Sequence, residues 1–408
     1  MNLKNINYNK IFYYSILSFA FILPLSRAGI SFFSIFLPIL WLADKNIKTK
    51  LQQLKSNKLI LAISIYLLFS ILSSLWSSNV EQTLNIIRLN SYWVLIFVIS
   101  SSVKKEQVPT IISSFLAGMF VSEILAYGVF FELWHFKYAT PQNPSPFMFW
   151  IDYSVFMAFT SILLLNRILS KNYDLKQKIL FSMFFISVTG NLFLAIGRTG
   201  QVAFIAGVFV MMIIHYRLSI KSLFLSFILL GTIFTTAYQL SNSFKTRVNA
   251  GINDIKHIKN MDLNGSWGIR VAYWITTFDI VKEQPILGVG IGDFKDETAK
   301  VLTNQNYNYL TKETKEFMKI NHPHNQYLLV LLQMGIIGIF IFLYLIYQIL
   351  KLDIKEKEIK ELSILFTTIF FVSCFAEPLF LKQFTISLFM LFIGLFIASS
   401  NKENAIIA

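Results

Sequence analysis

Two histidines stand where a polar segment ends and an apolar run begins. His322 and His324 flank Pro323, and the apolar run that follows extends to about Leu350. Imidazole titrates near neutral pH, so His324 could act as a general base. A titratable cluster at the mouth of a membrane span is costly and therefore indicates function. His324 is the first candidate for chemistry; the alternative is that it only caps the following helix, with His322 as a neighbour of no special role.

Metal binding is a second chemistry open to two closely spaced histidines. No third histidine or carboxylate with ligand-like spacing lies nearby in the sequence, whereas protein metal sites use three or four ligands. The single cysteine, Cys374, lies inside an apolar run, so this chain alone can build neither a disulfide nor a cysteine metal site. We therefore expect no metal and no cofactor.

Two arginines are candidates for binding phosphate, because the planar guanidinium matches phosphate oxygens with a fork of donors. Arg198 lies in Gly197-Arg198-Thr199-Gly200, between two apolar runs that leave almost no loop. Arg270 lies on an amphipathic stretch of a long polar segment. The alternatives are an interfacial anchor for Arg198 and a solvated charge for Arg270. Arg88 is a lesser candidate.

Three further polar residues lie at the ends of apolar runs. Glu377, followed by Pro378, and Asp152 could each pair with an arginine or line a cavity. Asn325 directly follows His324. Glu377, His322 and Asn325 are lesser site candidates beside His324, Arg198 and Arg270.

The composition predicts an all-α membrane protein with many spans. Of 408 residues, 55% are hydrophobic and only 14% are charged, whereas soluble domains carry about a quarter charged residues. The net charge of +14 comes from Lys and Arg that punctuate the apolar runs, so we expect no nucleic-acid partner. About twelve runs are long enough to span a bilayer; they centre near 11–26, 29–43, 58–76, 91–102, 109–132, 149–166, 179–196, 200–216, 222–239, 325–350, 363–381 and 384–400.

The connecting segments alternate in charge, which predicts the orientation. Segments assigned to the inside, from Lys4 to Lys402, carry 20 Lys and Arg, against 5 on the short outside segments. The positive-inside rule then puts both termini in the cytoplasm. We expect an N-terminal bundle of about nine spans over 1–239, an outside loop domain over 240–324, and about three C-terminal spans over 325–408.

Several shorter patterns add detail. Residues 268–283 have helical spacing, with Val271, Trp274, Ile275 and Phe278 on one face, which is typical of a helix on the membrane surface or packed on the bundle. Residues 79–90 suit a short helix in the outer interface. The glycines of 288–292 predict a turn with positive backbone torsions, and Gly335 and Gly338 predict close helix packing.

Taken together, these motifs resemble those of a known family. His324-Asn325, nine intervening residues and Gly335-x-x-Gly338 are similar to the His-Asn/Ser/Gln-x9-Gly-x-x-Gly signature of bacterial O-antigen ligases, in the O-antigen ligase/polymerase superfamily. The tight outer loop with Arg198, the Arg-x-x-x-Trp segment at Arg270, and Pro285-x-x-Gly288-x-Gly290 agree with this resemblance.

The resemblance implies a metal-independent, inverting glycosyltransferase of the GT-C type in the bacterial inner membrane. It would transfer a glycan from undecaprenyl diphosphate to a sugar hydroxyl of the lipid A core at the periplasmic face. Arg198 and Arg270 would bind the donor diphosphate, and His324 would activate the acceptor. The donor is already activated, so no ATP is implied.

Three alternatives stay open. A polymerase of the same superfamily would join repeat units on the polyprenyl carrier, but such polymerases often show two sizeable outer loops. A protein O-oligosaccharyltransferase would be expected to carry a large C-terminal soluble region. A flippase or other transporter, from a different class, would place charge near mid-bilayer, whereas here the candidate charges lie at the outer interface.

Overall fold

The computed structural model describes residues 8–304 and 307–400, and the elements in these ranges are helical. The α-helices are α1 Tyr8–Ile22, α2 Arg27–Leu42, α3 Ile47–Lys55, α4 Lys58–Leu72, α5 Val80–Asn90, α6 Val94–Ser102, α7 Val108–Phe130, α8 Trp150–Leu169, α9 Leu175–Leu194, α10 Arg198–Tyr216, α11 Ile220–Leu240, α12 Asn242–Lys259, α13 Gly268–Glu283, α14 Phe294–Asn304, α15 Lys312–Ile320, α16 Gln326–Leu350, α17 Lys357–Ser373 and α18 Gln383–Ser400.

Local sequence explains where many of these helices begin. The first turn of a helix leaves backbone N–H groups without partners, and a short polar side chain satisfies them. Such N-caps are found at Ser26, Asn57, Asn79, Asp174, Ser219, Ser241, Thr311 and Asn325. The polar residues between the apolar runs therefore also start the next helix.

All twelve predicted apolar runs fall on helices, but the predicted count of spans is not confirmed. Nine helices of the described residues are long and apolar enough to cross a bilayer, or ten if the bent pair α2 and α3 forms one span. The helices α1 and α17 have 15 and 17 residues, which is short for a hydrocarbon core of about 30 Å. The segment predicted as an interfacial helix, α5, instead continues into α6 as a single 23-residue span, Val80–Ser102.

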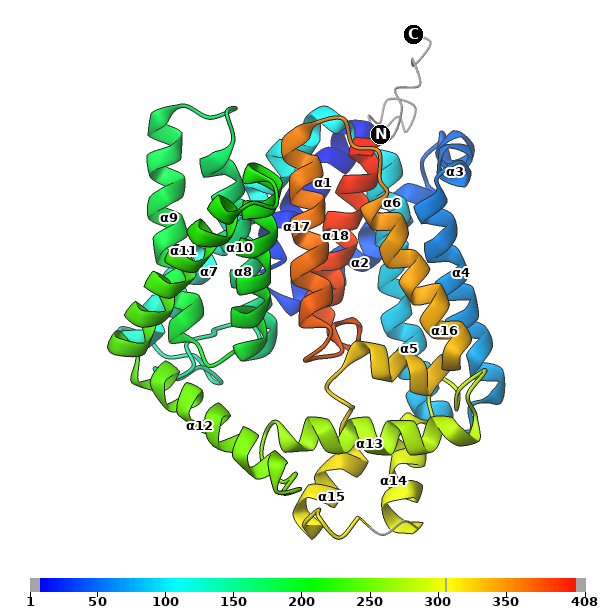
Figure 1. Cartoon of the computed structure of the whole chain (residues 1–408). Helices are drawn as coiled ribbons and strands as arrows, with labels where there is room; N and C mark the ends of the chain where they lie inside the picture. Colours follow the sequence, from blue (N-terminus) through cyan, green and yellow to red (C-terminus); the bar gives the residue numbers. More distant parts are fainter. Residues whose placement is uncertain (1–7, 305–306, 401–408) are drawn as a thin grey trace.

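The centre of the bundle is formed by α18 and α8, which have most of their residues buried. α18 packs against α6 and α17, and α8 packs against α9 and α10 (Figure 1). Phenylalanines fill the spaces between these helices. For example, the ring centroids of Phe370 on α17 and Phe389 on α18 are 4.8 Å apart. This core holds the ends of α8, α10 and α17 in fixed positions.

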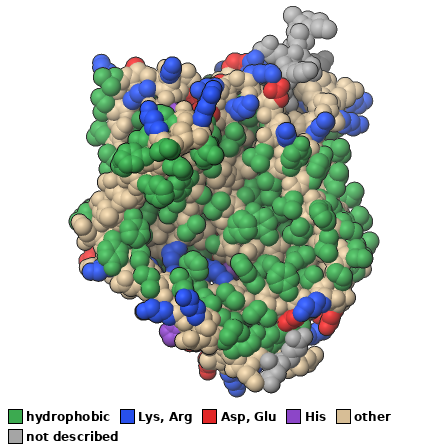
Figure 2. All heavy atoms as spheres, in the orientation of Figure 1, with side chains coloured by type: hydrophobic (Ala, Val, Ile, Leu, Met, Phe, Trp, Pro, Cys, Tyr) green, Lys and Arg blue, Asp and Glu red, His purple; other side chains and the backbone are tan. Residues whose placement is uncertain are grey.

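The helices α12 to α15 lie together at one end of the bundle, the lower end in Figure 1. α1 begins and α18 ends at the opposite end. The terminal residues 1–7 and 401–408, including Lys4 and Lys402, lie outside the described residues. Figure 2 shows hydrophobic side chains across the middle of one face, with Lys and Arg gathered above and below, as expected for a bundle that spans a membrane.

α13 has the predicted boundaries, but its predicted apolar face is divided: Val271 and Ile275 pack on the protein. Trp274 and Phe278 are exposed, whereas the side that packs on the protein carries Tyr273, Thr276 and Ile280 among other residues. Of the two predicted arrangements, packing on the bundle is observed, because α13 contacts α16, and the exposed Trp274 and Phe278 remain available to the membrane surface.

α16 is broken where the sequence predicted close helix packing. Gly335 has φ 61° and ψ −161°, a conformation that is essentially restricted to glycine. The strap of residues 285–290 fills the break: the Ile336 N–H donates to Pro285 O at 2.9 Å, and the Val289 N–H donates to Leu332 O at 2.8 Å. Gly288 and Gly290 have positive φ, as predicted for this glycine-rich turn.

Candidate functional site

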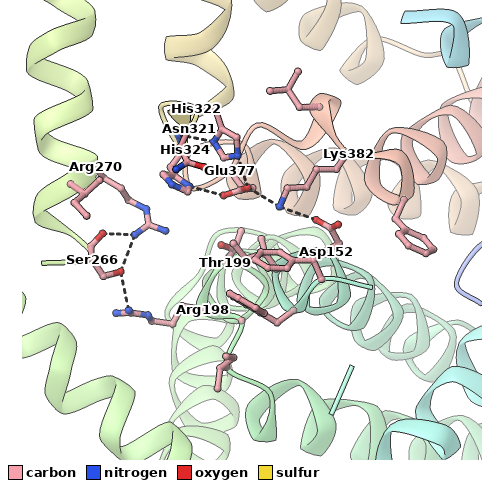
Figure 3. Close-up of a pocket in the computed structure, with 18 of the residues that line it drawn as sticks. Asp152, Arg198, Thr199, Ser266, Arg270, Asn321, His322, His324, Glu377 and Lys382 are labelled. Carbon is pink, nitrogen blue, oxygen red and sulfur yellow. Dashed lines mark hydrogen bonds and ion pairs between the residues drawn. The ribbon is translucent and has the colours of Figure 1, made fainter. Parts of the chain in front are cut away.

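A cavity of about 830 Å³ opens between the bundle and the α12–α15 layer. Its walls come from the first residues of α2, α8 and α10, from α12 and α13, from the segment that precedes α16, and from the segment that joins α17 to α18 (Figure 3). A cavity of this size is within the usual range for small-molecule sites. The structure thus brings residues from distant parts of the chain to one place.

Arg198 reaches the cavity because the glycines beside it let α10 approach α8 closely. A β-carbon on Gly197 would lie 2.4 Å from Ser154 Cβ, and one on Gly200 would lie 2.0 Å from Ser154 O. The Gly200 N–H donates to Ser154 Oγ at 3.0 Å. The tight turn therefore places Arg198 at the first residue of α10, with its side chain in the cavity wall.

Arg198 and Arg270 converge on one serine. Arg198 Nη2 donates to Ser266 Oγ at 3.3 Å, and Arg270 Nη1 donates to Ser266 O at 2.7 Å and to Ser266 Oγ at 3.4 Å (Figure 3). Neither guanidinium has a carboxylate within ion-pair distance among the described residues. Arg198 Nη1 is buried without a hydrogen-bond partner there. Two adjacent cations that form no ion pair with a described carboxylate are suited to binding an anion.

His324 and Glu377 form the facing wall. His324 Nδ1 lies 3.0 Å from Glu377 Oε2. His324 has φ 48°, in the left-handed region. The next residue, Asn325, caps α16 by accepting the Tyr327 and Leu328 N–H groups. Because Asn325 is the cap, the imidazole of His324 is free to point into the cavity.

Aromatic rings fix the orientation of the His324 imidazole. The Phe317 ring is stacked at 6.2 Å between centroids with an interplanar angle of 5°, and the Tyr273 ring lies edge-on at 6.0 Å. The Tyr273 hydroxyl in turn donates to Met318 O at 3.0 Å. With Nδ1 directed at Glu377, Nε2 is the ring nitrogen left to accept a proton.

His322 contacts the same carboxylate as a neutral ring. Its Nδ1 accepts the His324 N–H at 3.3 Å, so its proton is on Nε2, which lies 3.4 Å from Glu377 Oε1. Burial lowers the pKa of His322 to about 4, although the charge of Glu377 opposes the shift. Burial alone would raise the pKa of Glu377, but the hydrogen bond with His324 and the charge of Lys382 lower it to about 2, with a further contribution from the histidines when they are protonated. At neutral pH, Glu377 is therefore ionised beside a neutral His322.

Lys382 joins this wall to α8. Its Nζ lies 2.7 Å from Glu377 Oε1 and 3.3 Å from Asp152 Oδ1 (Figure 3). Of the two roles predicted for Glu377 and Asp152, pairing with an arginine is not observed, because this lysine pairs with both, whereas both residues do line the cavity. A buried acid is stabilised when it is paired and hydrogen-bonded, and Glu377 and Asp152 are both nearly fully buried.

Metal binding has to be considered again, because the structure brings a third possible ligand, the Glu377 carboxylate, next to the two histidines. His322, His324 and Glu377 offer ligand atoms that lie within 4.8 Å of one another, although Glu377 is far from the histidines in sequence. However, the Lys382 ammonium, 2.7 Å from Glu377 Oε1, would repel a cation at this position. The donor set therefore does not fit a metal well, and the absence of a metal stays a prediction.

The remaining predicted residues lie elsewhere. Arg88 is exposed on α5 and does not line the cavity. The sequence did not point to Lys382, Ser266, Arg247 or Arg27, which all line it. Lys382 had one usable signal, since it follows Glu377 by five positions on the same short outer segment.

Fold and site together define a multi-pass helical membrane protein with a charged cavity at one face of the bundle. Residues 182–343 match the family model described as O-antigen ligase, and this match supports a member of the O-antigen ligase superfamily. The matched family suggests glycosyltransferase-like activity on lipid-linked glycans. The matched range contains Arg198, Arg270 and His324. In a comparison with curated proteins, no sequence matched the chain.

Proposed function

We propose that the protein transfers a glycan from undecaprenyl diphosphate to a sugar hydroxyl of the lipid A core. The reaction would take place at the periplasmic face of the bacterial inner membrane, with both termini in the cytoplasm. One observation carries the proposal: two unpaired guanidiniums, on Arg198 and Arg270, and an oriented imidazole with a carboxylate partner line a single cavity.

Arg198 and Arg270 would bind the donor diphosphate. The bond between the anomeric carbon and the diphosphate oxygen breaks in the reaction, and its electron pair stays on that oxygen. The negative charge of the leaving diphosphate therefore grows in the transition state. Preorganised cations in a partly desolvated site stabilise such charge without having to reorganise. With its growing charge stabilised by the two arginines, the diphosphate can leave without further activation.

His324 would act as the general base. Its Nε2 takes the proton of the acceptor hydroxyl while the hydroxyl oxygen forms the new bond to the anomeric carbon. A positioned base of this kind contributes about 10² to 10⁴ in rate. Glu377 would stabilise the imidazolium that results. Attack opposite the diphosphate inverts the configuration at the anomeric carbon.

A gene deletion complemented with His324→Ala tests the proposal. We expect lipid A-core to lose its long glycan while full-length polyprenyl-linked polymer accumulates, and the variant to insert normally in the membrane. His257→Ala is the matched control, because His257 lies on α12 outside the cavity lining. Near-normal glycan ladders with His324→Ala would refute the role of this residue.

The same experiment separates the alternative functions. Accumulation of single polyprenyl-linked repeat units in the deletion strain would instead indicate a polymerase. A complete absence of glycan outside the inner membrane would indicate a flippase. In a purified system, transfer from undecaprenyl-diphosphate glycan to lipid A-core without ATP would exclude both.

A further inference from the structure

α12 forms the part of the cavity lining next to Arg198 and Arg270. The sequence analysis did not single out this helix. Arg247 lies on this helix and lines the same cavity as Arg198 and Arg270. Arg247 is exposed and has neither a hydrogen bond nor an ion pair to any described residue. An exposed arginine is usually only solvated. Arg247 differs from its neighbour Lys245, which does not line the cavity and lies 5.6 Å from the ring of Tyr238.

Gly251 lies on the same side of α12 as Arg247, since residues four apart in a helix are neighbours. A β-carbon built on Gly251 would be 3.7 Å from Arg198 Nη1, which is an ordinary van der Waals contact. The side of α12 that meets Arg198 therefore carries a guanidinium and, one turn later, a glycine that lies close to Arg198 Nη1.

The two arms of the Arg198 guanidinium face different partners. Nη2 donates to Ser266 Oγ, to which Arg270 also donates. Nη1 lies toward Gly251 and is buried without a partner among the described residues. A buried donor without an acceptor is costly, so an anionic oxygen that reached Nη1 from the cavity would remove this cost. Arg247 would provide the second cation on that side.

We propose that Arg247 is a third anion-binding residue and that it selects lipid diphosphates over lipid monophosphates, an inference that rests on the proposed function. One phosphate would lie at Arg270 and the Nη2 arm of Arg198. The other would lie at the Nη1 arm and Arg247, on the side of the cavity that α12 lines. A monophosphate can occupy only one of these positions, so it gains little from Arg247.

Binding of undecaprenyl diphosphate and undecaprenyl monophosphate to the purified full-length protein tests this. We expect Arg247→Gln to weaken diphosphate binding about tenfold or more, the loss expected for charge-assisted hydrogen bonds, and to change monophosphate binding much less. Lys245→Gln, with the same charge change on the same helix, should bind both lipids like the wild type. Inorganic pyrophosphate should compete more weakly in Arg247→Gln than in the wild type if the phosphates, and not the lipid, are recognised.

A second variant tests the close approach of α12 to Arg198. Gly251→Leu should weaken diphosphate binding while Arg247 is intact, and Gly251→Ala should be tolerated because a contact of 3.7 Å is ordinary. Gly231→Leu is the control, since a β-carbon there would meet no atom within 4 Å.

The outcomes separate this inference from the proposed function. If Arg247→Gln binds the diphosphate like the wild type, or if Lys245→Gln weakens binding equally, the role of Arg247 is wrong while the diphosphate site stands. If the wild type binds neither lipid, both the inference and the proposed function fail.

Discussion

Glu377 Oε2 lies 3.0 Å from His324 Nδ1, although the two residues are 53 positions apart in the sequence. The pairing decides which ring nitrogen can act as a base. When Nδ1 donates its proton to the carboxylate, Nε2 is unprotonated and can accept the proton of an acceptor hydroxyl. The carboxylate also stabilises the positive charge that the ring then gains. Glu377 is thus a positioning residue that acts through His324.

Glu377→Gln should lower kcat by ~10² or more, as expected when a general base is held in the wrong tautomer. The glutamine amide can donate to Nδ1 and so favour the tautomer with the proton on Nε2. The measurement is kcat at saturating donor, with unfolding temperature in detergent as the check on folding. Glu361→Gln is the control, because Glu361 is a similarly buried acid of α17 that does not line the cavity. Wild-type kcat in Glu377→Gln would remove Glu377 from the mechanism.

The parts of the site that lie next to apolar runs could be predicted from the sequence. Arg198 stands out because two apolar runs leave no room for a loop, and Arg270 because α13 has a clear helical pattern whose limits, Gly268–Glu283, match the prediction. His324 stands out as a titratable residue at the start of an apolar run. Each of these signals depends on local sequence only.

What the sequence could not predict depends on contacts between distant segments. A hydropathy pattern contains no information on which carboxylate contacts His324. Glu377 was therefore only one of several candidates, and its partner Lys382 was not predicted. Likewise, hydropathy reads α16 as one continuous run, because an average over side chains carries no information on the torsions of Gly335. The break is visible only once the strap of residues 285–290 is in place.

Arg198→Lys should reduce kcat/KM at least about tenfold, because one ammonium cannot replace the two arms of a guanidinium that face different partners. Nη2 contacts Ser266, and Nη1 is left for the ligand. Steady-state kinetics with the lipid-linked donor would measure the loss. Arg88→Lys, on an exposed arginine outside the cavity, should have no effect. Unchanged kinetics in Arg198→Lys would mean that only a positive charge is needed at this position.

Chelators should leave transfer activity unchanged. The three groups that could hold a metal, His322, His324 and Glu377, are hydrogen-bonded to one another or paired with Lys382. The measurement is the rate of glycan transfer after dialysis against EDTA, with and without added Zn²⁺ or Mg²⁺. Inactivation that added metal reverses would show that the cluster is a metal site and that Lys382 moves aside.

The protein should become easier to unfold as the pH falls below about 6.5, the ordinary pKa of histidine. The pKa of His322 is lowered to about 4 in the folded protein, so between these values the unfolded chain binds a proton that the folded chain does not. The pKa of Glu377 is lowered to about 2 from its ordinary value of 4.5, so protonation of this carboxylate continues the loss of stability at lower pH. Unfolding temperatures in detergent between pH 7 and 4.5 would measure it. His322→Gln should flatten the dependence, and His257→Gln, at an exposed histidine, should not; equal slopes in all three proteins would contradict the assignment.

Gly335→Ala should destabilise the protein and strongly reduce transfer, because the break in α16 carries the strap of residues 285–290. An alanine at φ 61° and ψ −161° is strained by about 1 to 3 kcal/mol. Its β-carbon would in addition lie 2.3 Å from Ile286 O, so the strap would have to move away. The strap continues to Asp293, which accepts the Ser78 and Asn79 N–H groups at 2.7 and 2.8 Å, so its displacement would loosen the attachment of α13 and α14 to the bundle.

The unfolding temperature and the transfer rate of Gly335→Ala should therefore fall together. Gly231→Ala provides the reference for a glycine-to-alanine change inside a helix of this chain, since nothing lies within 4 Å of its β-carbon. If Gly335→Ala matched that control in both measurements, α16 could run through this position as a regular helix. The break and the strap would then not be needed to position His324 and Arg270.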